Sequence, residues 1–423
     1  MIRVANGQGF WGDWLEAPAR LVEQGPIDYL TLDYLAEVTM AVLEKQRQRN
    51  PELGYAADFP PLMERLAPEM RQRSIRVVTN AGGLNPRACA REVLRRAPGL
   101  KIAIVEGDDV TARIGEFLAK GHPLNNIDTG EPIGQIRDRI LSANAYLGAF
   151  PLAQALTAGA GVVISGRCAD SALVLAPSIH AFGWSADAWD LLAAGATAGH
   201  VVECGAQTTG GNSQVDWREI PDLDEIGYPI AEIDAGGTFA ITKHAGTGGR
   251  VTTEIVKEQL LYEIGDPRSY LTPDVIADFT GLDLADEGPD RVRITGARGR
   301  ERPPRLKLSI NYRAGWKATG RWSTPRRTRF KRRRRPTASC GAGSKSSACV
   351  STKSIPNILA GTRAMAGLRR RHATSRRCSC GSACAGACGA TWTALRGRWL
   401  RWCSAARQAP PAMAAKGARR SAK

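Results

Sequence analysis

The chain has 423 residues and a formal net charge of +17, which comes from 58 Lys and Arg against 41 Asp and Glu. The charge is unevenly distributed: residues 321–423 hold 25 of the basic residues and no acid, whereas residues 1–320 hold 33 basic residues and all 41 acids. The global charge is therefore no argument for a nucleic-acid partner of the first 320 residues. No apolar run approaches the roughly 18 residues of a membrane-spanning helix, so we expect no membrane segment either.

The amino-terminal residues favour a cytoplasmic location. Met1-Ile2-Arg3-Val4-Ala5-Asn6 lacks the apolar run of a signal peptide and predicts a strand. Only Cys89, Cys168 and Cys204 precede residue 321, and none has a close cysteine neighbour in the sequence. This sparse, odd count is typical of reduced thiols in the cytosol.

Short β-branched runs alternate with longer amphipathic stretches along the first 220 residues. Asn85 is a suitable helix cap, Pro86 suits the first helical position, and Gly99 follows the expected helix end. A second helical pattern begins after Asp109 and stops at Gly121. The alternation predicts an α/β fold with a mainly parallel sheet covered by helices, and places the chemistry on loops beyond the carboxyl ends of the strands. The expected strands are Ile2–Ala5, Tyr29–Leu32, Ile75–Thr79, Ile102–Val105 and Val162–Ser165.

After Pro221 the pattern changes. We expect a strand over Thr238–Thr242 and a helix over Thr253–Ile264. Arg291–Thr295 and Leu306–Tyr312 flank a charged Gly/Pro loop, which predicts an antiparallel pair. The expected domains are an α/β domain over 1–285, the start of a smaller α+β portion over 286–320, and a separate tail over 321–423.

Gly7-Gln8-Gly9-Phe10-Trp11-Gly12 follows the first strand and fits the GxGxxG pattern, with Asp33 at the end of the next strand. In a dinucleotide-binding fold these glycines would admit a pyrophosphate and the acid would hold a ribose. Trp11 is bulky for a phosphate turn, so a substrate-facing turn without a nucleotide is the favoured interpretation. No cofactor follows from the sequence.

The loop Thr79-Asn80-Ala81-Gly82-Gly83-Leu84-Asn85-Pro86 joins a strand to a helix. Its backbone N–H groups could face an anion, which makes Asn80, Gly82 and Gly83 candidate ligand-binding residues. A tight turn with a helix cap is the alternative.

Arg167 follows an apolar strand within Ser165-Gly166-Arg167-Cys168-Ala169-Asp170. Its guanidinium could bind a carboxylate or a phosphate with two hydrogen bonds. An internal pair of Arg167 with Asp170 that only holds the loop is the alternative, and the two interpretations are compatible.

His200, Glu203 and Cys204 lie within one short segment. On a helix, His200 would meet Glu203 and Cys204 together, whereas on a strand only His200 and Cys204 would share a face. His200 and Glu203 are the candidate catalytic pair, because imidazole titrates near neutral pH and the carboxylate could orient it or act as base. A structural histidine is the alternative, and the spacing matches no metal-binding motif.

Lys243-His244-Ala245-Gly246-Thr247-Gly248-Gly249-Arg250 is a glycine-rich loop with three basic side chains. Lys243, Gly248 and Gly249 are therefore candidate ligands of an anion. A solvated surface loop is the alternative.

Residues 1–320 resemble the acyclic terpene utilisation (AtuA) family in order and with ordinary spacing. The resemblance implies a role in the breakdown of acyclic terpenoids, a route that runs through acyl-CoA thioesters, and it transfers no catalytic residue. The segments that carry it are IDYLTLDYLAEV at 27–38, TNAGGLNP at 79–86, VVISGRCADSALVLAP at 162–177, GHVVECGAQTTGGN at 199–212, GYPIAEI at 227–233, GTGGRVT at 246–252 and EQLLYEIGDPRSYLTPDV at 258–275.

The tail over 321–423 has one Val, one Phe, no Tyr and no acid, so it predicts no packed core. Back-translated and shifted by two bases, residues 321–360 and 376–386 can encode segments with a helical apolar stripe, balanced charge and strand-like alternation. These segments resemble the continuation of the family. We interpret the tail as out of frame and disordered, with few contacts to the body; a basic nucleic-acid-binding tail is the alternative.

Three hypotheses follow for function. The first is an enzyme, or a subunit of one, that binds a carboxylate or an acyl-CoA with Arg167 and Lys243 and moves protons with His200 and Glu203. The second is a non-catalytic subunit or binding protein that uses the same loops, with homo-oligomers or a partner subunit allowed by both. The third is an inactive, truncated product.

Overall fold

The computed structural model describes residues 1–214, 216–315, 319–322, 378–381 and 419–422. It divides into two compact units, one over Met1–Tyr312 with Ala415–Lys423 and the other over Arg313–Ala414. The first unit contains every candidate site residue.

A mixed nine-stranded sheet forms the centre of the first unit, in the order β11-β12-β8-β7-β1-β2-β3-β6-β4. The strands from β1 to β4 in this order are parallel, and β7, β8, β12 and β11 extend the sheet by antiparallel pairing. The predicted α/β fold is confirmed, with an antiparallel extension on one side. The strands are β1 (Ile2–Gln8), β2 (Tyr29–Leu32), β3 (Arg76–Thr79), β4 (Ile102–Val105), β6 (Val162–Ser165), β7 (Ile230–Ile233), β8 (Phe239–Thr242), β11 (Asp283–Asp286) and β12 (Arg291–Thr295).

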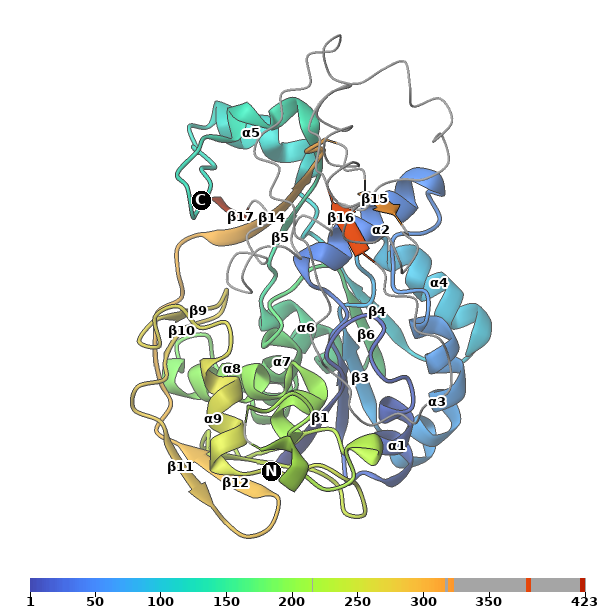
Figure 1. The fold of residues 1–423 in the computed structure, drawn as a ribbon, viewed down its shortest axis with the longest axis vertical. Coiled ribbons are helices and arrows are strands. Elements are labelled where there is room, and N and C mark those ends of the chain that lie inside the picture. The colour runs from blue at the N-terminus through green and yellow to red at the C-terminus, as the bar shows by residue number, and fades with distance from the viewer. Residues whose placement is uncertain (215, 316–318, 323–377, 382–418, 423) are drawn as a thin grey trace, which may run out of the picture. The chain divides into compact units, whose positions relative to one another are not determined.

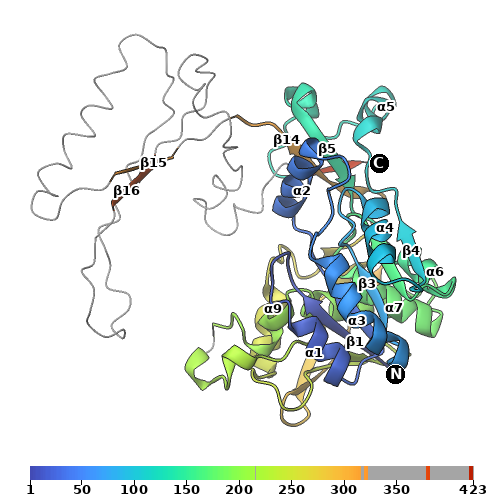
Figure 2. The same cartoon turned by 90° about the vertical axis from the view of Figure 1, so that its right-hand side faces the viewer.

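Helices cover both faces of this sheet. Alternate strand residues point to opposite sides, and both faces carry apolar side chains that the helices bury. Val78 and Val163 pack in one core with α6, α7 and α8, whereas Val77 and Val162 pack in the other with α1, α3 and α4. Figures 1 and 2 show these two helical layers. The helices are α1 (Ala17–Gln24), α2 (Glu37–Arg49), α3 (Phe59–Arg73), α4 (Pro86–Arg96), α5 (Ile114–Ala119), α6 (Ala149–Thr157), α7 (Ala172–Phe182), α8 (Trp189–Val202) and α9 (Thr253–Leu261).

Two helix ends follow the predicted chemistry. The Asn85 side chain accepts a hydrogen bond from the Ala88 N–H at the start of α4, and Pro86 is the first residue of this helix. Gly121 has a φ of +81° just after α5. None of the helices in the described ranges is long and apolar enough to cross a membrane; α3, the longest of them, has 15 residues.

The predicted antiparallel pair of residues 291–295 and 306–312 is wrong. β12 pairs with β8 and β11 in the large sheet, whereas β14 (Leu306–Tyr312) pairs with β5 (Ile140–Ala145) in a second sheet. The expected domain boundary between residues 285 and 286 lies inside β11. The residues between β12 and β14 form β13 (Arg298–Arg300), which joins β9 (Tyr270–Leu271) and β10 (Ile276–Asp278) in a third sheet.

Most of residues 321–423, on which we predict a disordered tail, lie outside the described residues. The structure describes β15 (Thr319–Trp322) paired with β16 (Cys378–Gly381) in the second unit. It also describes β17 (Arg419–Ala422) paired with β14, a contact for which the sequence contains no signal.

Candidate functional site

Several candidate residues lie together beyond the carboxyl ends of the parallel strands. Asp33 follows β2, Asn80 follows β3, and Arg167 follows β6. His200 and Glu203 join them from the end of α8, because Asn6 of β1 donates hydrogen bonds to the carbonyls of Val202 and Glu203. We call the set Asp33, Asn80, Arg167, Asp170, His200 and Glu203 the strand-end cluster.

The Arg167 side chain is buried, with only 3% of its surface exposed. Its Nη1 donates to Asp170 at 2.5 Å, and its guanidinium lies 4.2 Å from the centre of the Tyr146 ring. Burial alone would lower the pKa of Arg167, but Asp170 and Glu37 raise it well above its ordinary value. The predicted Arg167–Asp170 pair is thus present, and it keeps a charged guanidinium inside the cluster.

His200 and Glu203 form a buried pair on one turn of the α8 end, as the helical alternative predicts. The His200 Nδ1 lies 3.0 Å from the Glu203 Oε1, and Gln259 donates to the His200 carbonyl. Burial alone would lower the pKa of His200, but the charge and hydrogen bond of Glu203 raise it. Burial raises the pKa of Glu203 to about 7, and His200 opposes this rise. The pKa of Glu203 therefore lies in the range useful for proton transfer, and Glu203 favours the protonated form of His200. Burial also raises the pKa of the Cys204 thiol, which leaves it protonated and a poor nucleophile.

Two aromatic rings enclose His200. Tyr270 of β9 lies 5.1 Å from the imidazole centre, and Phe279, just after β10, is stacked on it at 5.7 Å. Neither ring can be predicted from the sequence, since both lie about 70–80 residues further along the chain and no local pattern links them to His200.

The sequence suggests Asp33 only as a ribose ligand in a dinucleotide-binding fold, whereas the structure places it inside the strand-end cluster. Its Oδ1 accepts hydrogen bonds from the Asn80 Nδ2 at 2.7 Å and from the Leu35 N–H at 3.1 Å. Asn80 in turn accepts the Tyr34 N–H with its Oδ1. In this structure Asn80 holds Asp33 in position.

Three buried polar atoms of the cluster have no hydrogen-bond partner within the part of the chain that the structure describes. They are the Arg167 Nε, the His200 Nε2 and the Glu203 Oε2. Leaving such a group unsatisfied costs about 1–3 kcal/mol, and native proteins keep few of them. A donor, an acceptor and an imidazole nitrogen of the cluster therefore remain without a partner among the described residues. The described residues include no group of three or more His, Cys, Asp or Glu side chains suited to hold a metal ion.

Gly82 and Gly83 have packing roles. A Cβ on Gly82 would lie 2.5 Å from the Ser165 carbonyl oxygen, and Gly83 has a φ of +54° with its N–H bonded to the Asn80 carbonyl. The N–H groups of Leu84 and Asn85 are also bonded within the protein. Anion binding by this loop stays a prediction to which the geometry adds nothing.

The loop after β8 is held by contacts within the protein at each of its three candidate residues, Lys243, Gly248 and Gly249. Lys243 pairs with Asp290 at 3.0 Å and donates to the Thr247 carbonyl. The Gly248 and Gly249 N–H groups donate to the carbonyls of Glu225 and Pro221. These contacts hold the loop after β8 closed and connect Lys243 to a different set of residues from those around Arg167.

The turn after β1 packs on the end of α8. A Cβ on Gly9 would lie 2.6 Å from the carbonyl carbon of Cys204, and Gly7 lies inside β1 against Pro18. Since α1 starts only at Ala17, the glycines do not lead into a helix as in a dinucleotide-binding turn. The glycines instead allow β1 to bring Glu203 into the cluster.

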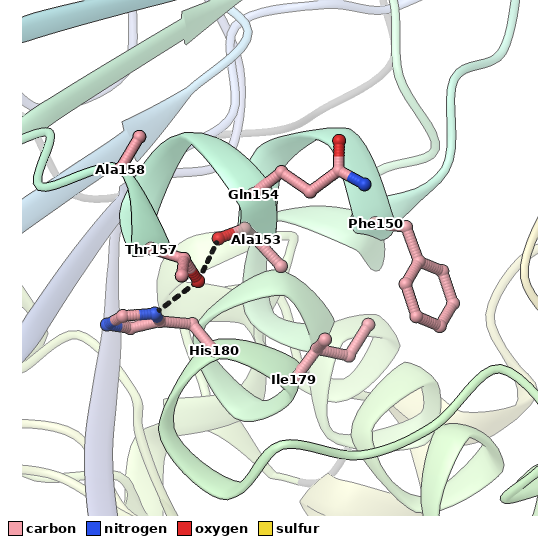
Figure 3. A pocket seen from close by; sticks show the side chains of 7 residues that line it. All are labelled: Phe150, Ala153, Gln154, Thr157, Ala158, Ile179 and His180. Atoms are coloured by element: carbon pink, nitrogen blue, oxygen red, sulfur yellow. Dashed lines mark hydrogen bonds between the residues drawn. The ribbon is translucent and has the colours of Figure 1, made fainter.

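A surface hollow of about 380 Å³ lies elsewhere, between α6 and α7, and Figure 3 shows its lining. His180 on its border contacts Arg76 at 2.7 Å and Thr157 at 3.0 Å. Arg76 begins β3, so the hollow is at the amino ends of the parallel strands, the edge opposite to the strand-end cluster. Because arginine only donates, His180 accepts with Nε2 and is neutral; burial lowers its pKa, as does the charge of Arg76.

Comparison with known proteins supplies the family. No curated protein sequence and no solved structure matches the chain. The family model described as acyclic terpene utilisation family protein AtuA matches residues 2–334, and so extends past the predicted end of the family pattern at residue 320. This match covers most of the chain, including every residue of the strand-end cluster. The chain belongs to the acyclic terpene utilisation family AtuA.

Proposed function

We propose that the protein is an enzyme, or a subunit of one, in the breakdown of acyclic terpenoids or related branched acyl compounds, and that the strand-end cluster binds the acyl end of its ligand. The observation that carries this proposal is the set of three buried atoms, the Arg167 Nε, the His200 Nε2 and the Glu203 Oε2, that have no partner in the described residues. Together they offer a donor, an acceptor and a proton-transfer group. A carbonyl or carboxyl group with a hydrogen atom on the neighbouring carbon fits that set.

Arg167 binds the ligand oxygen in this proposal. Its Nη1 and Nη2 both donate to Asp170, so the Nε–H is the donor without a partner among the described residues. Tyr146 stacks on the guanidinium and Glu37 accepts a hydrogen bond from the Tyr146 hydroxyl at 2.7 Å, which fixes the ring. The donor is therefore held in place before the ligand arrives, a condition for efficient catalysis.

His200 and Glu203 move the proton. Glu203 holds the His200 Nδ1, so the Nε2 is the nitrogen that can take a proton from the ligand. The aromatic rings of Tyr270 and Phe279 exclude water from the imidazole. The geometry resembles other acid–base pairs in which a carboxylate orients a histidine.

The charges favour the acyl end over phosphates as the group bound here. Arg167 interacts with Asp33, Asp170 and Glu37, all of them acids, and Glu203 lies in the same electrostatic network. A multiply charged phosphate group would be repelled by these carboxylates. If the ligand is a coenzyme A thioester, we place its phosphates outside the cluster.

Calorimetry with 3-methylbutanoate and its coenzyme A thioester tests this proposal on the full chain. Arg167→Lys keeps a positive charge beside Asp170 but lacks the Nε–H, so we expect binding to weaken about tenfold to hundredfold. Arg87→Lys is the matched control, because Arg87 is an exposed arginine paired with Glu106. Equal affinity of the Arg167→Lys variant and the parent would contradict the proposal, and binding without turnover would favour the non-catalytic subunit.

A further inference from the structure

Asp33 is a buried carboxyl group to which the proposed function assigns no role. Only 5% of its surface is exposed. Both of its hydrogen bonds, from Asn80 and Leu35, reach the same oxygen, Oδ1. Among the described residues, no hydrogen bond reaches Oδ2, which leaves this oxygen for another contact.

The carboxyl group is held on rigid strand ends. Asp33 directly follows β2, and Asn80 directly follows the neighbouring parallel strand β3. The Tyr34 N–H donates to the Asn80 Oδ1 at 2.8 Å, which turns the Asn80 amide so that its Nδ2 faces Asp33. A group fixed in this way keeps its position when a ligand binds.

The charges around Asp33 favour its protonated form. Asp170 and Arg167 act on it from the turn after β6, and Glu203 acts on it from the end of α8. Two carboxylates thus oppose one guanidinium around a buried acid. Burial raises the pKa of Asp33 well above its ordinary value, Asp170 and Glu203 add to this rise, and Arg167 and Asn80 oppose it.

We propose that Asp33 is the proton donor of the strand-end cluster and protonates a carbonyl oxygen of the ligand while His200 takes a proton from the adjacent carbon. This proposal rests on the proposed function and adds its reaction class, proton transfer next to a carbonyl group. Such chemistry usually requires an acid and a base in one site, with environments that hold the two groups in different protonation states.

The step is balanced without an oxidant or a metal. The carbon–hydrogen bond breaks and its proton passes to the His200 Nε2, while its electron pair forms a carbon–carbon double bond. The carbonyl oxygen takes the Asp33 proton and becomes the hydroxyl of an enol. The Asp33 carboxylate that remains is stabilised by Arg167 and by the Asn80 Nδ2–H, and the reverse steps return a proton from His200 to the carbon and a proton from the enol hydroxyl to Asp33.

Isotope-edited infrared spectroscopy of the full chain tests whether Asp33 carries a proton. With carbonyl-labelled aspartate, we expect a protonated-carboxyl band at pH 7 that is absent in Asp33→Asn and unchanged in the control Asp187→Asn, which alters an exposed acid. Asn80→Leu removes a donor that stabilises the carboxylate, so it should shift the titration of this band upward by about one to two pH units. The Asn80→Leu variant also decides the assignment if Asp33→Asn does not fold. A band that persists in Asp33→Asn, or a band in the parent that Asn80→Leu does not shift, would overturn the proposal.

Deuterium exchange tests the reaction. We expect the parent to incorporate solvent deuterium beside the carbonyl of the 3-methylbutanoyl thioester, and Asp33→Asn to do so roughly 10²–10⁴ times more slowly. Exchange in Asp33→Asn at the parental rate would overturn the role of Asp33. The infrared titration needs no ligand, so its result separates a wrong assignment of Asp33 from a wrong ligand class: a titrating Asp33 in a protein that binds neither acyl probe would contradict the proposed function instead.

Discussion

Glu203 carries a cost in folding free energy, because one of its carboxyl oxygens is buried without a hydrogen bond among the described residues. Its Oε1 bonds His200, but its Oε2 is buried without a hydrogen-bond partner among the described residues. Such an atom opposes folding, and it persists because α8 and the Asn6 side chain hold the backbone at this point. Proteins keep costs of this kind mainly where function needs them.

The Glu203→Gln variant should flatten the pH dependence of stability. The folded pKa of Glu203 is about 7 against an ordinary 4.5, so its carboxyl contributes stability in full below about pH 4.5 and loses it as the pH rises through 7. His200, whose pKa is raised from 6.5, has the same sign. We expect the parent to lose on the order of 2–3 kcal/mol between pH 5 and 8 and the variant much less, measured by urea unfolding at each pH.

The control for this prediction is Glu219→Gln, which changes an exposed carboxyl. It should follow the parental curve at every pH. A Glu203→Gln curve parallel to the parental one would show that Glu203 does not titrate in this range.

At the scale of elements, the site depends on how closely the end of β1 approaches the end of α8. A Cβ added to Gly9 would lie only 2.6 Å from the carbonyl carbon of Cys204. Gly9→Ala should therefore push the two elements apart and destabilise the protein by about 1–3 kcal/mol, the range of overpacking. It should also weaken ligand binding, because Glu203 moves with the backbone. Thermal unfolding and calorimetry measure the two effects.

Gly134→Ala is the matched control, since a Cβ at Gly134 would meet no described atom within 4 Å. It should leave both the melting temperature and binding unchanged. If Gly9→Ala behaves like Gly134→Ala, the close contact between β1 and α8 does not position Glu203.

The elements that the sequence predicted well are those decided by local chemistry. β2, β4 and β6 have the predicted bounds because short runs of apolar residues that include β-branched ones favour buried strands. The pairing of β14 with β5 could not be predicted, since it depends on residues more than 160 positions apart. The same holds within the site: Arg167–Asp170 and His200–Glu203 are local pairs, whereas the contact of Asn80 with Asp33 bridges 47 positions.

On the scale of the whole molecule, we expect the tail to decide whether the chain is soluble. We propose that the reading frame is lost near residue 320, before the family match ends at residue 334, and that the chain beyond residue 334 does not encode the family's own continuation. β5, β14 and β17 form a small sheet with Ile310 and Leu308 in its core, and in this proposal the family continuation extends this part of the fold. Restoring the frame at residue 320 should therefore yield a soluble protein that melts cooperatively, whereas the chain as given should be insoluble or cut by protease near residue 320. Expression and limited proteolysis of the two forms, side by side, measure this.

Two results would contradict the frame-loss proposal. One is cooperative melting of the given chain with its tail protected from protease. The other is DNA binding with a steep salt dependence that truncation after residue 320 abolishes, as expected of a basic nucleic-acid-binding tail. Measuring DNA binding at several salt concentrations, with and without the tail, also serves as the control for nonspecific charge effects.

The enclosure of His200 by Tyr270 and Phe279 has a consequence for the synthesis of the protein on the ribosome. The imidazole is synthesised about 70–80 residues before the rings that cover it. At roughly 5–20 residues per second, the gap lasts about 4–16 s. During that interval the buried part of α8, from Leu192 to Val202, lacks β10, β13 and the rings of Tyr270 and Phe279 that later pack against it. A nascent chain paused there exposes the interior of its own candidate active site, and this interval is when a chaperone would protect it.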